Sequence, residues 1–94
     1  MTKIGNLQIL SRRLHEILSR YSIQDGDAAM VLKFMGQLFE DIEQGKIAPP
    51  KEFIYRWYFG STDSPLAKFD DLIDAAADFS HVLEDWPTPI IIGN

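Results

Sequence analysis

Cysteine is absent from this sequence of 94 residues. The chain therefore has no disulfide framework, no thiolate nucleophile and no cysteine-based zinc site. Its longest hydrophobic runs, such as residues 89–92, fall far below the roughly 20 residues that cross a bilayer, and no apolar signal-peptide core follows Met1. We expect a cytoplasmic protein without membrane contact, whose stability comes from packing alone.

Residues that mark a catalytic site are also scarce. The two histidines, His15 and His81, are far apart, and there is no glycine-rich phosphate-binding loop. No nucleophile beside a base and no paired acids in a cleft are visible. Asp74, Asp78 and His81 share one predicted helical face, but three ligands on one exposed helix form only a weak metal site. We expect no enzymatic activity, no catalytic residues, no cofactor and no metal.

The formal net charge of -5 is unevenly distributed along the chain. Up to residue 39 there are five bases and three acids, whereas from residue 40 onward there are eleven acids and four bases. The acidic part would repel a nucleic acid, because affinity for nucleic acids depends on Lys and Arg that neutralise phosphates. The composition disfavours direct nucleic-acid binding and favours a basic protein partner.

Chain length and hydrophobic periodicity predict one helical domain, residues 1–94. Apolar residues recur at three- and four-residue spacing over residues 7–21 and 28–42, which indicates two amphipathic helices. Asp25 and Asp27 are both candidate N-caps of the second helix, and we choose Asp27. Gly45 is expected to end that helix, because glycine adopts a left-handed conformation at little cost.

The segment at residues 51–59 is ambiguous between helix and strand. Its aromatic residues suit a strand, but no convincing second strand exists to satisfy its backbone groups. We interpret it as a short helix with Pro50 as its first residue. With a last helix near the C-terminus, the sequence predicts an all-α bundle of about four helices.

The last predicted helix has two contrasting faces. Its apolar stripe, with alternating four- and three-residue spacing, consists of Leu72, Ala76, Phe79, Leu83 and Trp86. Its opposite face carries the acids Asp70, Asp74, Asp78 and Asp85, with Asp71 at the edge. Like charges one turn apart destabilise a helix by roughly 0.2–0.5 kcal/mol per pair, and a partner that supplies Lys or Arg would relieve this repulsion. The alternative is an ordinary solvated face.

Arg56 stands among six aromatic or aliphatic residues at positions 53–59. Aromatic residues and arginine are enriched at interface hot spots. These rings either form the core, with Arg56 paired to a carboxylate, or they supply apolar anchors for a partner, for which we name Tyr55, Trp57 and Tyr58. The tail at residues 89–92 either folds back onto the core or lies exposed as a contact strip.

The stretch from Leu38 to Asp78 resembles small acidic helical bacterial immunity proteins of the colicin D and contact-dependent inhibition type. The matching features are an acidic helix before Gly45-Lys46-Ile47, then Glu52-Phe53 with an aromatic run through Trp57, and a helix with Leu72, Ala75, Ala76 and Asp78. The resemblance implies an acidic surface that occludes the basic active site of a cognate toxin nuclease domain.

Our functional hypothesis is therefore an immunity protein that binds and neutralises such a toxin. Its expected partner-binding residues are Asp70, Asp71, Asp74, Asp78, Glu84, Asp85, Tyr55, Trp57 and Tyr58. The alternative is a small helical adaptor or homo-oligomeric module that associates through its aromatic segment or isoleucine tail. Ionic strength separates the two, because an electrostatic complex weakens with salt and an apolar one does not.

Overall fold

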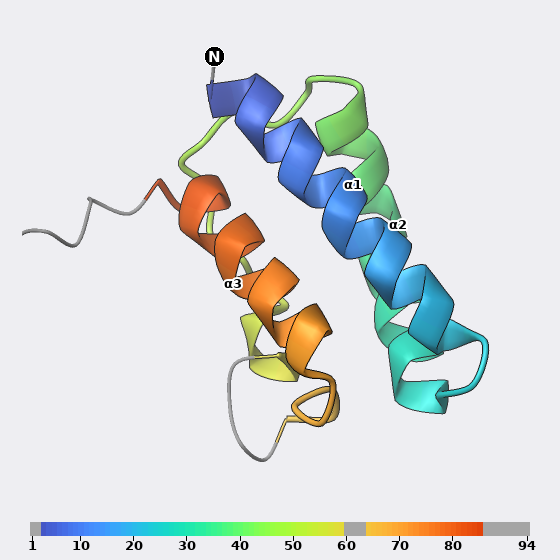
Figure 1. Ribbon diagram of the computed structural model, residues 1–94. Helices are drawn as coiled ribbons and strands as arrows, with labels where there is room; N and C mark the ends of the chain where they lie inside the picture. The colour runs from blue at the N-terminus through green and yellow to red at the C-terminus, as the bar shows by residue number, and fades with distance from the viewer. Residues whose placement is uncertain (1–2, 60–63, 86–94) are drawn as a thin grey trace, which may run out of the picture.

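Three α-helices form the framework of the structure. The computed structural model describes residues 3–59 and 64–85, which contain α1 (Lys3–Ser22), α2 (Gly26–Glu43), the short 3-10 turn η1 (Arg56–Tyr58) and α3 (Asp70–Leu83). These ranges contain no strand. Helix α1 packs against both α2 and α3 (Figure 1). The predicted all-α class is confirmed, with three α-helices where about four were expected.

The two N-terminal helices follow the predicted apolar periodicity. Leu7, Leu14 and Leu18 are fully buried on one face of α1. After the end of α2, Gly45 has the left-handed φ of 75° that the sequence predicts, and its amide donates to the carbonyl of Ile42 at 3.0 Å. Glycine meets this geometry without strain, so the chain leaves the helix there.

The N-cap of α2 is Asp25, so the choice of Asp27 is wrong. The helix begins at Gly26, and the Asp25 carboxylate accepts a hydrogen bond from the amide of Ala28 at 3.0 Å. Asp25 has the extended backbone of a capping residue, with φ -131° and ψ 121°. Lys68 adds an ion pair to the same carboxylate at 3.1 Å. That pairing joins distant parts of the chain and has no local sequence signal.

The connection from α2 to α3 does not form the predicted helix over residues 51–59. Only Arg56–Tyr58 is helical, as a single 3-10 turn, and Pro50 lies in non-helical backbone after a cis Pro49-Pro50 bond. The Lys51 amide donates instead to the Leu83 carbonyl of α3, at 2.8 Å. Backbone amides at the start of this segment therefore bond to α3 and to the residue after it, and they do not need the hydrogen bonds of a helix.

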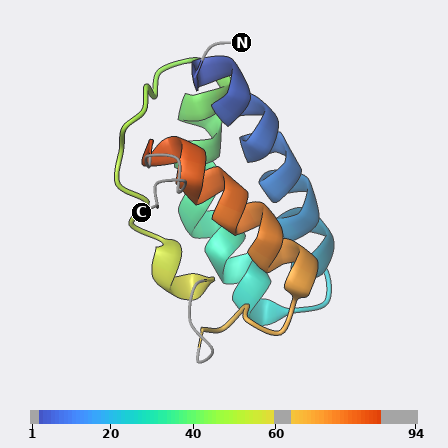
Figure 2. The ribbon, with the colours of Figure 1, turned by 60° about the vertical axis from the view of Figure 1, so that its left-hand side comes forward.

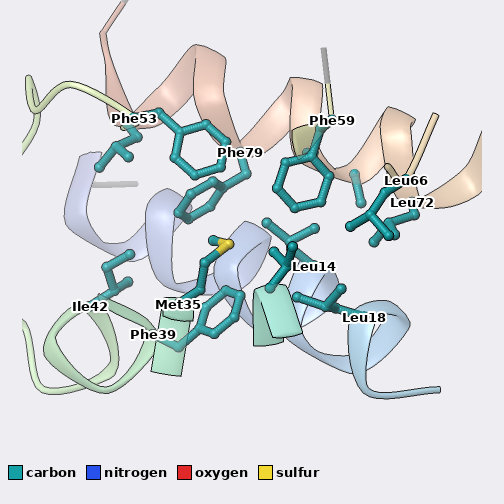
Figure 3. Close-up of a cluster of buried hydrophobic side chains, with 14 of the residues drawn as sticks. Leu14, Leu18, Met35, Phe39, Ile42, Phe53, Phe59, Leu66, Leu72 and Phe79 are labelled. Atoms are coloured by element: carbon teal, nitrogen blue, oxygen red, sulfur yellow. The ribbon is translucent and has the colours of Figure 1, made fainter. Parts of the chain in front are cut away.

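Side chains from this connection complete the hydrophobic core. Phe53 and Phe59 are buried with ring centroids 5.9 Å apart, and Phe53 meets Phe79 of α3 edge-on at 5.2 Å. Figure 3 shows these rings above Met35 and Phe39 of α2. Figure 2 shows η1 (yellow) on the opposite side of α3 from α1 (blue). The connection thus takes the place of the expected fourth helix.

Helix α3 has the apolar stripe that its sequence predicts. Leu72, Ala76, Phe79 and Leu83 are all buried. The next stripe residue, Trp86, and the tail at 89–92 lie outside the described residues. Asp85 follows the helix with a left-handed φ of 54°. This backbone conformation is not helical, so the helix does not continue through Asp85.

Replacing the cap of α2 tests this assignment. Asp25→Ala is expected to lower the free energy of unfolding by about 1 kcal/mol, because it removes a side-chain cap. The Ala28 amide and then Lys68 hold the pKa of Asp25 below its usual value. The stabilisation is therefore present above about pH 4, the pKa of an unfolded aspartate, and is lost as the pH falls through the lower folded pKa. Urea unfolding at pH 7 and pH 3 measures both effects.

Asp27→Ala is the matched control, since Asp27 lies in the first turn without the capping bond. It should cost only a few tenths of a kcal/mol through the helix dipole. Equal losses in the two variants at pH 7 would contradict the assignment of Asp25 as the cap.

Candidate functional site

Two of the α3 acids are already engaged by α1. Asp71 accepts a hydrogen bond from the Tyr21 hydroxyl at 2.7 Å, and this bond raises the pKa of Tyr21. Asp78 forms an ion pair with Arg13 at 3.0 Å. Both carboxylates remain exposed; Arg13 offsets the charge of Asp78, whereas the neutral Tyr21 hydroxyl only donates a hydrogen bond to Asp71. The acids of this helix therefore differ in how far their charge is neutralised within the molecule.

Asp70 and Asp74 form the unpaired part of that row. Both are exposed on the outer side of α3, one helical turn apart. Within the described part of the chain, neither makes a hydrogen bond through its side chain or an ion pair. Their mutual repulsion is the kind that a cationic partner relieves.

The Glu84 side chain is largely buried and holds the α2–α3 connection against α3. Its side chain is only 9% exposed and forms an ion pair with Arg56 of η1. Its other carboxylate oxygen accepts a hydrogen bond from the Phe53 amide at 2.9 Å. The expected pairing of Arg56 with a carboxylate is confirmed. Glu84 is largely inaccessible to a partner, whereas Asp85 beside it is exposed.

The three aromatic residues named as anchors differ in exposure. Trp57 is 61% exposed, whereas Tyr55 and Tyr58 are half-buried and pack against the core. The Tyr58 ring contacts Trp57 on one side, with centroids 5.4 Å apart, and Phe34 of α2 on the other, at 6.2 Å. Phe34 is itself 44% exposed. These rings join η1 and α2 into one aromatic surface.

Met30 and Ile54 extend this surface as exposed apolar residues. Met30 lies one turn before Phe34 on α2, and Ile54, three residues before Trp57 in sequence, lines a pocket with Gln37 of the same helix. We call the set the aromatic edge; its members are Met30, Phe34, Ile54, Trp57 and Tyr58. Sequence reasoning missed Met30 and Phe34. Their signal is an apolar pair spaced i,i+4 that falls outside the buried stripe of α2.

The turn η1, which carries Trp57 and Tyr58 of the aromatic edge, borders α3 across a pocket. A pocket of about 240 Å³ between η1 and α3 is bordered by Arg56 on one side and by Ile73 and Ala77 on the other. Ile73 and Ala77 flank Asp74 in the sequence of α3. A partner that covers η1 therefore approaches Asp74 as well.

The described residues offer little else that carries chemistry. They contain no group of three potential metal ligands, and none of their helices is long and apolar enough to cross a membrane. The His15 ring stacks on Phe39 with centroids 4.7 Å apart.

Comparison with protein-family models, curated proteins and solved structures found no match to this chain. The resemblance to immunity proteins therefore stays a prediction.

Neutralising Glu84 tests its role in holding the connection. Glu84→Gln is expected to lower the free energy of unfolding by about 1–2 kcal/mol, because Arg56 loses its charge partner while the Phe53 amide keeps an acceptor. Glu52→Gln is the matched control, since Glu52 is exposed and its neutralisation should change stability by under about 0.5 kcal/mol. Thermal and urea unfolding of both variants give the comparison, and equal stability would contradict the role.

Proposed function

We propose that this domain is a protein-binding module whose contact surface is centred on the aromatic edge. The observation that carries the proposal is the exposure of Trp57 and Phe34, joined through Tyr58 into one continuous surface. Isolated exposed apolar residues are normal on a folded protein, whereas a contiguous aromatic surface marks an interaction site. Tryptophan and tyrosine are also the residues most enriched at interface hot spots.

The fold itself does not require this exposure. The core is filled by other rings, among them Phe39, Phe53, Phe59 and Phe79. A buried aromatic side chain removes 150–250 Å² from water, at about 25 cal/mol per Å². Covering Trp57 and Phe34 with a partner would therefore recover free energy that the isolated domain leaves in solvent.

The partner is a protein with a basic contact region. Asp70 and Asp74 stand without internal cations on the adjoining part of α3, and the chain as a whole carries a net charge of -5. Unpaired carboxylates accelerate association with a cationic surface at low ionic strength. The same charge disfavours nucleic acid as the partner. The module acts by binding and is not an enzyme.

The specific form of this proposal is an immunity protein. The domain would neutralise a cognate toxin nuclease by covering its basic active site, as the sequence resemblance implies. Self-association through the aromatic edge is the second candidate, and the exposure of Trp57 favours it equally. The two candidates differ in their dependence on charge, because a homodimer gains nothing from the surplus of acids.

The aromatic edge is tested by the double variant Trp57→Ala with Phe34→Ala. The partner is sought first in the product of the gene adjacent to this one in its genome, and binding is measured by biolayer interferometry. We expect at least a tenfold loss of affinity, about 1.4 kcal/mol, because hot-spot aromatics are removed. Ile23→Ala is the control, since Ile23 is 88% exposed and outside the edge. An equal effect of control and double variant would contradict the proposal.

The acids are tested by Asp70→Asn with Asp74→Asn, which removes charge without changing shape. We expect slower association at low salt and a smaller salt dependence, with little change in dissociation. Asp27→Asn with Glu40→Gln is a control of equal charge change on α2, at exposed acids without an ion pair among the described residues. An unchanged association rate in the aspartate variant would remove the electrostatic role. Concentration-dependent sedimentation abolished by Trp57→Ala would favour self-association.

A further inference from the structure

A second pocket lies between the C-terminal half of α2 and the connection that follows it, with a volume of about 220 Å³. After α2 the chain runs back toward η1, as Figure 2 shows, and the connection supplies the other wall of this pocket. Ile54 belongs both to the pocket and to the aromatic edge, and Gln37 of the pocket lies about one turn after Phe34 on α2. The pocket therefore continues the aromatic edge.

The walls of this pocket are mainly apolar. Leu38, Ile47 and Tyr55 line it half-buried against the core, and Ile54 adds an exposed side chain. The Tyr55 ring lies edge-on to the buried Phe53 ring, with centroids 6.3 Å apart. The pocket is smaller than the roughly 300–1,000 Å³ of sites that hold small molecules. Its size therefore suits one side chain of a partner.

The polar part of the lining favours a cation. Among the described residues it contains two acids, Asp41 of α2 and Glu52 of the connection, and one base, Lys51. The Gln37 amide donates to Oδ1 of Asp41 at 2.9 Å, and within the described part of the chain the other oxygen, Oδ2, accepts no hydrogen bond. A carboxylate oxygen with this spare capacity forms a strong hydrogen bond to a positively charged donor.

We propose that this pocket receives an arginine side chain of the protein partner. This contact rests on the proposed binding function and gives the chemical identity of one of its anchors. The apolar stem of arginine packs along Leu38 and Ile54, while the guanidinium donates to Asp41 and Glu52. A planar guanidinium also stacks on an aromatic ring, which Tyr55 supplies. A lysine ammonium is a strongly hydrated point charge and uses the ring less well.

Lys51 weakens the attraction of the pocket for a cation. Its side chain is exposed and forms no ion pair within residues 3–59 and 64–85. Its ammonium therefore repels an incoming arginine. The bond from its backbone amide to Leu83 does not involve the side chain, so the charge can be removed without releasing the connection. Neutralising Lys51 and neutralising the acids should change binding in opposite directions.

The first test uses the full chain alone and the probe N-acetyl-arginine N-methylamide, titrated by two-dimensional amide NMR. We expect saturable shifts at the pocket residues, with a Kd on the order of 1 mM. The matching citrulline derivative keeps the shape without the charge and should bind at least fivefold more weakly. The lysine derivative should also bind more weakly. Shifts that do not saturate, or citrulline or lysine binding as tight as arginine, overturn the proposal.

Variants of the pocket give the second test with the same probe. Asp41→Asn with Glu52→Gln should weaken binding about fivefold, and Lys51→Gln should strengthen it about twofold. Asp27→Asn with Glu40→Gln is the matched control, since it removes the same charge from exposed acids of α2 outside the pocket. Equal losses in the two double variants, or weaker binding in Lys51→Gln, overturn the proposal.

Binding to the partner separates this contact from the function on which it rests. Asp41→Asn with Glu52→Gln should lower affinity for the partner at least fivefold. If this variant binds the partner normally while Trp57→Ala with Phe34→Ala does not, the arginine contact is overturned and the proposed function stands. If only the pocket variant loses affinity, the arginine contact is supported and the aromatic edge is not the centre of the binding surface.

Discussion

The carboxylate of Glu84 is the interaction on which the position of the α2–α3 connection depends. It binds Arg56 and the backbone amide of Phe53 at the same time, next to the bond from the Lys51 amide to Leu83. A carboxylate at the C-terminal end of a helix is opposed by the helix dipole, and its burial costs solvation. The guanidinium and the amide offset both costs. Glu84 thereby holds an irregular segment against α3 at the place where a fourth helix was expected.

The exposure of Trp57 follows from the same constraint. Phe53 and Phe59 at the two ends of the segment are buried, and Arg56 between them is directed toward Glu84. In a 3-10 turn with three residues per turn, successive side chains point in clearly different directions. With Arg56 held on the α3 side, Trp57 lies on the outside. The aromatic edge is thus a consequence of how the core is closed, and it is available to a partner without any rearrangement of the core.

The sequence predicted those parts of the fold that depend on interactions between residues close together in the chain. The two N-terminal helices, the end at Gly45 and the buried stripe from Leu72 to Leu83 all follow from periodicity and glycine geometry. Residues 51–59 escaped prediction because their backbone groups bond to α3. The ion pair of Lys68 with Asp25 could not be predicted locally, because Lys68 lies far along the chain.

The acidic face shows the same limit of prediction for the candidate site. The sequence of α3 alone shows a face of like charges, but Arg13, which neutralises Asp78, lies 65 residues away in sequence. Conversely, the exposed pair Met30 and Phe34 has a local signal, an i,i+4 apolar spacing outside the buried stripe of α2. Charge pairing is a property of tertiary structure, and a single-helix reading overestimates the free charge.

Charge and apolar surface contribute different things to recognition in this molecule. Many of the basic side chains in the described residues form ion pairs with acids of the same chain: Arg12, Arg13, Arg20, Arg56 and Lys68. The remaining acids, among them Asp27, Glu40, Asp70 and Asp74, are spread over α2 and α3. Such a diffuse negative field attracts a basic protein from many directions and sets the rate of encounter. It does not specify one docked arrangement. Specificity requires a localised surface that contributes binding free energy only when a partner of complementary shape packs against it. The aromatic edge is such a surface.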